Sequence, residues 1–385
     1  MTHRPTGWHR PMTARDPHEP HRISTPLELL FDLCFVVAIA QAGARLHHGI
    51  AEGHASHATL GYAVVFFAIW WAWMNFTWFA SAYDTDDVPY RLLVLVQIAG
   101  VLVLAAGVAR GLDGLDFRAI VAGYVLMRIG MVAQWLRAAR SHPEGRRTAL
   151  RYAGGLVLLQ ILWLGMLLLP RGLQVPTWLV LAAGELAVPV WAERAARTPW
   201  HPHHISERYG LMTLIVLGES ILAATVAVQS AMEAGAAAGR LLSVAGGGLL
   251  VIFSMWWLYF AESAHERLRG RREAFIWGYG HLVIFASAAA VGSGLAVAAD
   301  HAAGRAHVSQ AVASAAVVVP VSLYLLALWA VHQRHDRASG WRRYACPVAA
   351  VVLPAAVVLP GAVMIAGAAL AGLVAVASQP QTADR

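Results

Sequence analysis

Apolar runs of about 20 residues follow one another along this chain almost from residue 27 to its end. A helix of that length crosses the hydrocarbon layer of a bilayer, in which every backbone polar group needs a partner within the protein. Hydrophobic residues make up 58% of the sequence and charged residues only 13%, against roughly 25% charged residues in soluble domains. The sequence therefore predicts an all-α integral membrane protein.

Charged residues, prolines and glycines divide the apolar part of the chain into about twelve predicted transmembrane helices. These are residues 27–47, 57–80, 88–110, 116–139, 148–169, 174–193, 204–230, 240–263, 274–299, 308–332, 342–358 and 360–377. The last two are the weakest pair, because only Pro360 and Gly361 separate them.

The 29 Lys and Arg residues of this chain are all arginines. Their distribution tests the predicted number of spans. If the N-terminus is cytoplasmic, the inner segments hold 22 arginines and the outer segments six, and Arg128 lies inside the fourth span. This excess follows the positive-inside rule and predicts that both termini are cytoplasmic. Membrane orientation thus explains the net charge of +7, and we do not expect nucleic acid as a partner.

The chain is expected to divide into two tails and two halves. Residues 1–22 are rich in Arg, His and Pro and contain no apolar stretch, which predicts a disordered cytoplasmic tail and not a cleavable signal peptide. Residues 379–385 form a second cytoplasmic tail. Between the tails, matching residues predict a first six-helix repeat over 23–197 and a second over 198–378.

The repeat rests on five matches that occur in the same order in both halves. They are Phe67–Trp71 with Phe253–Trp257, Gln97 with His281, Tyr124 with Tyr324, Arg151–Ala153 with Arg343–Ala345, and Pro170 with Pro360. An even number of spans per copy makes the repeats parallel in the membrane, as in major facilitator transporters, whose substrate sites form between the halves. The analogy covers architecture only, because fold does not fix function.

Two carboxylates lie near the start of the first predicted span. Thr25, Pro26 and Glu28 have the spacing of a capping box with proline at the first helical position, so Glu28 is either a capping carboxylate or part of a polar site. Asp32 lies one turn further along the same helix face and precedes an unbroken apolar run. It therefore needs a buried partner or a water-filled cavity.

The seventh predicted span carries a second set of ionisable residues. Glu207 and Arg208 lie where the chain enters the bilayer and are either interfacial or part of a site. Glu219 is roughly ten residues beyond Tyr209, which at about 1.5 Å per residue is near the midplane. We expect Glu219 to be the counterpart of Asp32 in the second repeat.

Arg128 in the fourth span, Glu185 in the sixth and His281 in the ninth complete the deep ionisable residues. The counterpart of Arg128 in the second half is Leu328, so the duplication has diverged there. One buried arginine facing several carboxylates predicts an ion pair or a proton-coupled site between the repeats. The alternative is a static pair that only locks helix packing.

The other chemistry-bearing residues form no recognised motif. Two histidine groups lack the spacing of zinc sites, and Cys34 and Cys346 lie in different halves, so we expect neither a metal nor a cofactor. The tryptophans of the second span, Trp70, Trp71 and Trp73, are expected to pack between the repeats, the alternative being an aromatic substrate pocket.

Residues Thr25–Val36 and His204–Ser220 resemble the two signatures of the low temperature requirement protein A family, and Tyr279–His281 resembles a third. The resemblance covers about residues 20–378 and implies a bacterial inner-membrane protein with many spans. The name of the family refers to a requirement for growth in the cold, and the resemblance implies no particular substrate.

These observations favour a transporter-like protein that contacts the lipid bilayer and moves an unknown small molecule or ion. Its site is expected to be lined by Asp32, Arg128, Glu219 and His281. No nucleophile, metal or nucleotide motif is visible, so we do not expect an enzyme. Two alternatives stay open: an intramembrane enzyme that modifies a lipid or isoprenoid with Glu219 and His281 as acid and base, and a non-catalytic membrane component for cold adaptation.

Overall fold

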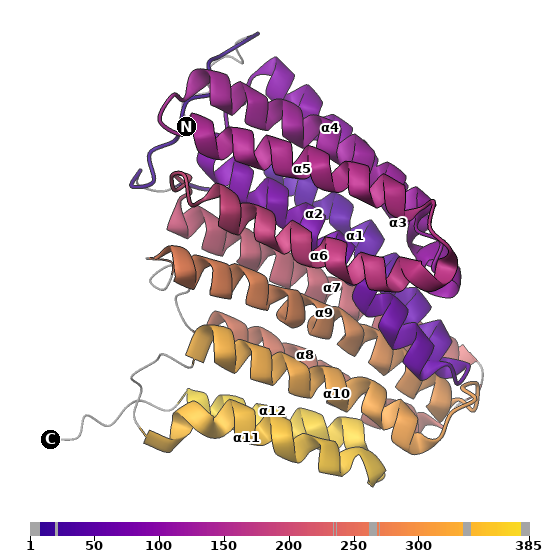
Figure 1. Ribbon diagram of the computed structural model, residues 1–385. Coiled ribbons are helices and arrows are strands. Elements are labelled where there is room, and N and C mark those ends of the chain that lie inside the picture. Colours follow the sequence, from indigo (N-terminus) through magenta and orange to yellow (C-terminus); the bar gives the residue numbers. More distant parts are fainter. Residues whose placement is uncertain are drawn as a thin grey trace, which may run out of the picture. The chain divides into compact units, whose positions relative to one another are not determined.

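The computed structural model describes residues 8–19, 22–233, 235, 237–261, 268, 270–333 and 340–378. The regular elements of these ranges are helices, as predicted. They are α1 (Pro26–Ala51), α2 (Ala55–Tyr83), α3 (Val88–Gly114), α4 (Arg118–Ser141), α5 (Arg146–Met166), α6 (Arg171–Ala192), α7 (Pro202–Glu233), α8 (Ala238–Phe260), α9 (Arg271–Ala302), α10 (Gln310–Leu328) with a π-helical turn (Trp329–Gln333), a 3₁₀ turn (Gly340–Tyr344), α11 (Ala345–Val352), a second 3₁₀ segment (Leu353–Val358) and α12 (Ala362–Ala377) (Figure 1). The predicted C-terminal tail, residues 379–385, lies outside the described residues.

Within the described ranges, ten helices are long and apolar enough to cross a membrane: α1 to α9, and α10 together with its π-helical turn. Their ends differ from the predicted ends by four residues or fewer. This agreement follows from the bilayer itself, whose thickness sets the length of an apolar helix. The protein is therefore a multi-pass membrane protein in contact with lipid.

The prediction of twelve spans is confirmed only in part, because the last two segments are shorter. α11 has 8 residues and is followed by a 3₁₀ segment, and α12 has 16 residues. Pro354 lies at the start of the 3₁₀ segment, where its missing backbone N–H and its ring disfavour continuation of the α-helix. Gly361, with a φ of 73°, adopts the left-handed conformation before α12 begins.

Contacts within the chain define two compact units, each of which takes part of α1 and of α2. The first unit runs to Ala38 and continues over Ala68–Arg208, so it contains α3 to α6. The second unit comprises Ile39–Phe67 and the chain from Tyr209 onward, so it contains α8 to α12. The predicted six-helix repeats, residues 23–197 and 198–378, stay a prediction.

Close backbone approach holds the neighbouring helices of the first unit together. A Cβ atom placed on Gly100 of α3 would lie 2.6 Å from the carbonyl oxygen of Gly123 on α4, and the reverse placement meets the oxygen of Gly100 at the same distance. Small residues permit such approach, which is how helices pack where lipid removes the hydrophobic drive. α4, α5 and α6 then follow side by side in chain order.

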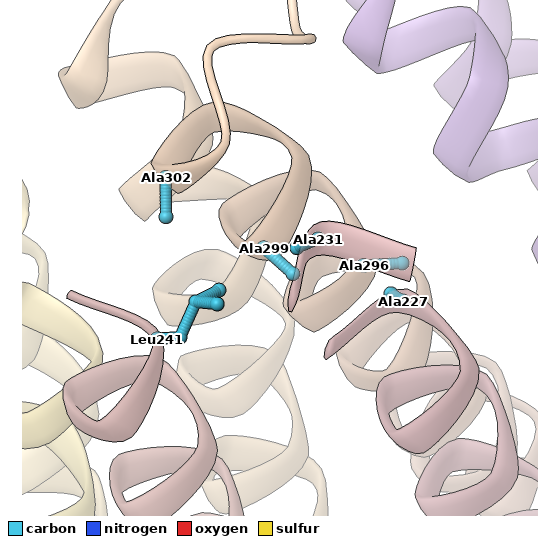
Figure 2. Packing of buried hydrophobic residues seen from close by; sticks show 6 residues of the cluster. All are labelled: Ala227, Ala231, Leu241, Ala296, Ala299 and Ala302. Carbon is cyan, nitrogen blue, oxygen red and sulfur yellow. The ribbon is translucent and has the colours of Figure 1, made fainter. Parts of the chain in front are cut away.

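Small residues also fill a core of the second unit. Its members are Ala227 and Ala231 of α7, Leu241 of α8, and Ala296, Ala299 and Ala302 of α9 (Figure 2). Because five of the six are alanines, α7 and α9 approach closely along this stretch. α9 continues against α10 in the same way, where Gly294 faces the carbonyl group of Ala316.

The described part of the N-terminal segment, residues 8–19, is ordered, contrary to the predicted disordered tail. Met12 is fully buried. The backbone N–H of Arg10 donates to Asp87 Oδ2 over 2.9 Å, and that of Arg15 donates to the carbonyl oxygen of Ala82 over 3.0 Å. One apolar anchor and specific backbone hydrogen bonds thus hold a segment whose overall composition is polar.

Candidate functional site

The first turn of α1 contains the predicted capping box. The N–H of Thr25 donates to Glu28 Oε2 over 2.7 Å, and the N–H of Glu28 donates to Thr25 Oγ1 over 3.3 Å. The other carboxylate oxygen, Oε1, lies 3.2 Å from His204 Nε2 and 3.2 Å from Arg208 Nη1, both on α7. Glu28 is therefore both a helix cap and a member of a polar site, so the two readings of its sequence pattern are compatible.

Asp32, one turn further along α1, is paired with Arg208. Arg208 donates from Nε to Asp32 Oδ2 over 2.8 Å and from Nη2 to Oδ1 in a second, short hydrogen bond. Trp73 of α2 donates from Nε1 to the same Oδ1 over 2.7 Å. Asp32 and Arg208 are both fully buried within the protein. Its two-point contact with the carboxylate fixes the geometry of the pair.

Arg22 and Asp84 extend this site beyond the ends of the spans. Arg22 Nη2 donates to the carbonyl oxygen of Ala80 over 2.9 Å and lies 3.8 Å from Glu28 Oε1 and 4.0 Å from Asp84 Oδ2. Burial lowers the pKa of Arg22. Burial and the nearby Glu28 carboxylate raise the pKa of Asp84 from 3.8 to about 7. Neither residue was predicted from the sequence, because Arg22 fell in the predicted tail and Asp84 in a predicted loop.

We call this set of side chains the charged network. Its members are Arg22, Glu28, Asp32, Asp84, His204 and Arg208. With a neutral histidine, three carboxylates face two guanidinium groups, so the set carries one negative charge in excess. At its edge, Arg15 and Glu19 pair with each other at 2.5 Å and together add no net charge. A single proton, on His204 or on Asp84, would balance the charged network.

Several polar atoms of the charged network are buried without a hydrogen bond. Among the described residues, these include Glu28 Oε1, both ring nitrogens of His204, and Arg208 Nη1. His204 Nε2 and Arg208 Nη1 each lie 3.2 Å from Glu28 Oε1, but outside hydrogen-bond geometry. Because an unsatisfied buried polar group costs about 1–3 kcal/mol, small rearrangements that form these bonds are favourable.

Arg128 and Glu185 form a second buried pair in the first unit. Arg128 Nη2 donates to Glu185 Oε2 over 2.7 Å. Trp71 donates to the same oxygen over 2.8 Å, and Trp163 donates to Oε1 over 3.1 Å. One cation faces one anion whose two oxygens are both hydrogen-bonded. The geometry favours the static pair over a site that binds and releases a proton.

Two tryptophans of α2 have a role that was not predicted from the sequence. Trp73 donates to Asp32 and Trp71 donates to Glu185, so each indole serves a buried carboxylate. The signal was present in the sequence, since a buried indole N–H needs an acceptor and the acids are the strongest acceptors in these spans. The expectation of purely aromatic packing left these hydrogen bonds out.

Glu219 lies in the second unit, beside a cavity of about 650 Å³. The cavity is lined by α1, α7 and α9 and by Arg305, which follows α9. Glu219 is half-buried and lies near the midpoint of the 32-residue α7. It is thus an acid within a membrane span that faces an open space.

His281 of α9 belongs to a separate cluster of the second unit and does not line that cavity. Its Nδ1 lies 2.7 Å from the carbonyl oxygen of Trp277 and must donate to it. In the neutral ring, Nε2 is then an acceptor, and it lies 3.0 Å from the hydroxyl of Tyr259 and 3.4 Å from His332 Nε2. Neither Tyr259 nor His332 was predicted from the sequence as a site residue. His332 lies in the π-helical turn, which hydropathy does not reveal.

Glu207 is half-buried, and its Oε1 accepts the backbone N–H of Ser24 over 3.3 Å. The eight predicted site residues thus occupy different surroundings. Glu28, Asp32 and Arg208 belong to the charged network, Arg128 and Glu185 to the second pair, Glu219 to the cavity, His281 to the histidine cluster, and Glu207 holds the chain before α1. Within the described residues, no three His, Cys, Asp or Glu side chains are placed to hold a metal ion.

Comparison with known proteins agrees with the membrane architecture. The family described as bacterial low temperature requirement A protein (LtrA) matches residues 23–378. An uncharacterised protein of Rhizobium meliloti (strain 1021) is 28% identical over 274 residues. The match covers 67% of this chain and 65% of that relative, so the chain spans slightly less than two thirds of the relative's length. No solved structure matches the chain. Because the family match includes α1, α7 and the whole charged network except Arg22, the chain belongs to the bacterial low temperature requirement A protein family.

Proposed function

We propose that this protein is a proton-coupled, transporter-like protein of the bacterial inner membrane, and that the charged network binds the coupling proton. The observation that carries the proposal is the charge imbalance of the network: three buried carboxylates face two guanidinium groups and one histidine. An uncompensated charge is costly in a buried site. Uptake of one proton is therefore favourable there.

The same geometry links protonation to helix contacts. Glu28 Oε1 faces His204 and Arg208 at equal distances and has no hydrogen bond to either. A proton on His204 strengthens the contact of this histidine with Glu28, whereas its loss leaves Arg208 as the nearest cation. Because these residues lie at the starts of α1 and α7, the exchange alters how these two helix ends are held together.

The proposal includes the orientation and the repeats predicted from the sequence. The 22 inner and six outer arginines support cytoplasmic N- and C-termini. The ordered matches between the halves support two parallel six-helix repeats. The proposed activity moves a small molecule or ion and contains no catalytic step.

Proteoliposomes that contain a pH-sensitive dye test this function. Protein-dependent proton movement is measured while a panel of small organic cations, organic anions and inorganic ions is added outside. We expect at least one class to move protons, and we expect Asp32→Asn and His204→Gln to lower the rate more than tenfold. Glu52→Gln, an exposed acid just after α1, is the matched control and keeps the wild-type rate.

Folding of each variant is checked by size-exclusion chromatography and circular dichroism. Wild-type rates in folded Asp32→Asn and His204→Gln proteins would contradict the proposal. If neutralising the acids abolishes folding and no compound moves protons through the wild-type protein, the non-catalytic role becomes the better explanation.

A further inference from the structure

The cavity of the second unit is built to hold a small molecule with an apolar body. Its volume of about 650 Å³ falls within the roughly 300–1,000 Å³ of small-molecule sites. Most of its lining is aliphatic, with Ile39 and Ala44 of α1, Leu222 and Val226 of α7, and Ala289 of α9 as examples. Such a surface contributes affinity but no preference for charge.

The charged groups at one end of the cavity satisfy one another. His47 Nε2 lies 2.7 Å from Asp300 Oδ2, and Arg305 Nη2 lies 2.5 Å from Asp300 Oδ1. Arg305 also donates from Nη1 to the carbonyl oxygen of Ser230 over 2.8 Å. The charge of Asp300 is therefore compensated within the protein.

The two serines deeper in the cavity are also occupied. Ser293 donates to the carbonyl oxygen of Gly43 over 2.9 Å. The hydroxyl of Ser220 lies 2.9 Å from the carbonyl oxygen of Ala288 and 3.0 Å from that of Val216, and it donates to them. Neither hydroxyl proton is available to a carboxylate in the cavity.

Among the charged side chains of the described lining, Glu219 is the exception. Its carboxylate lies among aliphatic side chains, and among the described residues no ion pair or hydrogen bond engages it. Arg305, the arginine of the cavity lining, is already paired with Asp300. An ionised carboxylate in these surroundings attracts a cation and repels an anion.

We infer that this cavity binds a small organic cation, a protonated amine with an apolar body, through Glu219. A divalent metal requires several oxygen or nitrogen ligands, and the described residues hold no suitable cluster. Quaternary ammonium groups are recognised by cages of Phe, Tyr and Trp rings, whereas the described lining contains none of these three residue types. A protonated amine supplies both the charge and the N–H donor that Glu219 lacks. The inference rests on the proposed function only in taking the bound amine as the transported molecule.

Binding is tested with dansylcadaverine, a primary amine whose fluorescence rises in apolar surroundings, titrated into the full-length protein in lipid nanodiscs. We expect saturable binding that weakens at least tenfold in Glu219→Gln and in Ala223→Phe, which fills the cavity. Glu219→Asp keeps most of the affinity. Glu233→Gln, an exposed acid at the end of the same helix, is the matched control and binds as the wild type does.

The N-acetyl derivative of the probe has the same body without the charge, so it tests the inference on the wild-type protein even if Glu219→Gln does not fold. Equal affinity for the charged and the acetylated probe, or wild-type affinity in folded Glu219→Gln, overturns the inference and leaves an apolar cavity that takes up lipid. Amine binding without any coupled proton flux supports this inference and contradicts the proposed function. Proton flux with another class of compound, in the absence of amine binding, supports the proposed function and contradicts this inference.

Discussion

Asp32 accepts two hydrogen bonds from the guanidinium group of Arg208, a residue 176 positions later in the chain, and neither side chain is exposed. Removing one member leaves a buried charge without its partner. Arg208→Gln and Asp32→Asn are each expected to lower the free energy of unfolding by about 3–5 kcal/mol. The double variant is expected to lose less than the sum of the two, as measured by thermal unfolding in nanodiscs.

The exposed pair of Asp86 and Arg91, at 2.7 Å, provides the control for this cycle. Both side chains are nearly half exposed, so neutralising either changes stability by less than about 1 kcal/mol. Strictly additive losses at Asp32 and Arg208 would show that the two residues do not stabilise the fold as a pair.

The pair of Arg128 and Glu185 is expected to be structural. Glu185→Gln and Arg128→Met each leave an unpaired buried charge and cost about 3–5 kcal/mol. Arg128→Met combined with Glu185→Gln restores part of this loss, and the folded double variant retains proton flux. In the predicted repeat, the position that matches Arg128 is Leu328, which is fully buried. Loss of flux in a stable double variant would place this pair in the transport machinery.

Asp84 makes stability depend on pH with an unusual sign. The pKa of Asp84 is raised from 3.8 to about 7 in the folded protein, so the folded state holds this proton more tightly than the unfolded state. Stability contributed by the protonated carboxyl is present below about pH 4 and is lost as the pH rises to about 7. Asp84→Asn removes this dependence, and the variant is more stable than the wild type at pH 8.

Asp87, three residues later, makes stability depend on pH with the opposite sign. Although burial opposes ionisation, hydrogen bonds from Arg137, Arg10 and Tyr90 lower the pKa of its carboxyl. Its contribution is present above about pH 4, the unfolded value, and is lost as the pH falls further. Unfolding temperatures of Asp84→Asn and Asp87→Asn, measured from pH 3 to 8, should therefore deviate from the wild type at opposite ends of the range. Parallel curves would refute the assignment of both groups.

Much of this architecture was predictable from the sequence, because the bilayer sets both the length and the composition of a span. The ten long helices follow directly from that constraint. The last two segments do not, since hydropathy averaged over a window takes no account of the missing N–H of Pro354.

The candidate site was only partly predictable. Spacing along one helix revealed the cap at Glu28 and the need of Asp32 for a partner. It did not identify the partner, because depth in a span says nothing about which helices lie side by side. From the sequence, Arg208 could be an interfacial residue or part of a site, and its pairing with Asp32 is visible only in the packing of α1 against the start of α7.

Glycines at helix contacts provide a test of the packing itself. A Cβ atom on Gly294 of α9 would collide with the carbonyl group of Ala316 on α10, so Gly294→Ala is expected to cost about 1–3 kcal/mol. Gly154→Ala in α5 adds its methyl group where no heavy atom outside the local helix backbone lies within 4 Å. It is expected to be neutral or stabilising by up to about 1 kcal/mol. Equal unfolding temperatures for the two variants would show that α9 and α10 are less closely packed.

The ordered segment before α1 has a consequence for biogenesis. Arg137 donates from Nη2 to Asp87 and to the carbonyl oxygen of Arg10, a residue made 127 positions earlier. At about 5–20 residues per second, the ribosome needs roughly 6–25 s to supply that partner. The segment before α1 can therefore take its final place in the first unit only after α1 to α3 and most of α4 have been made.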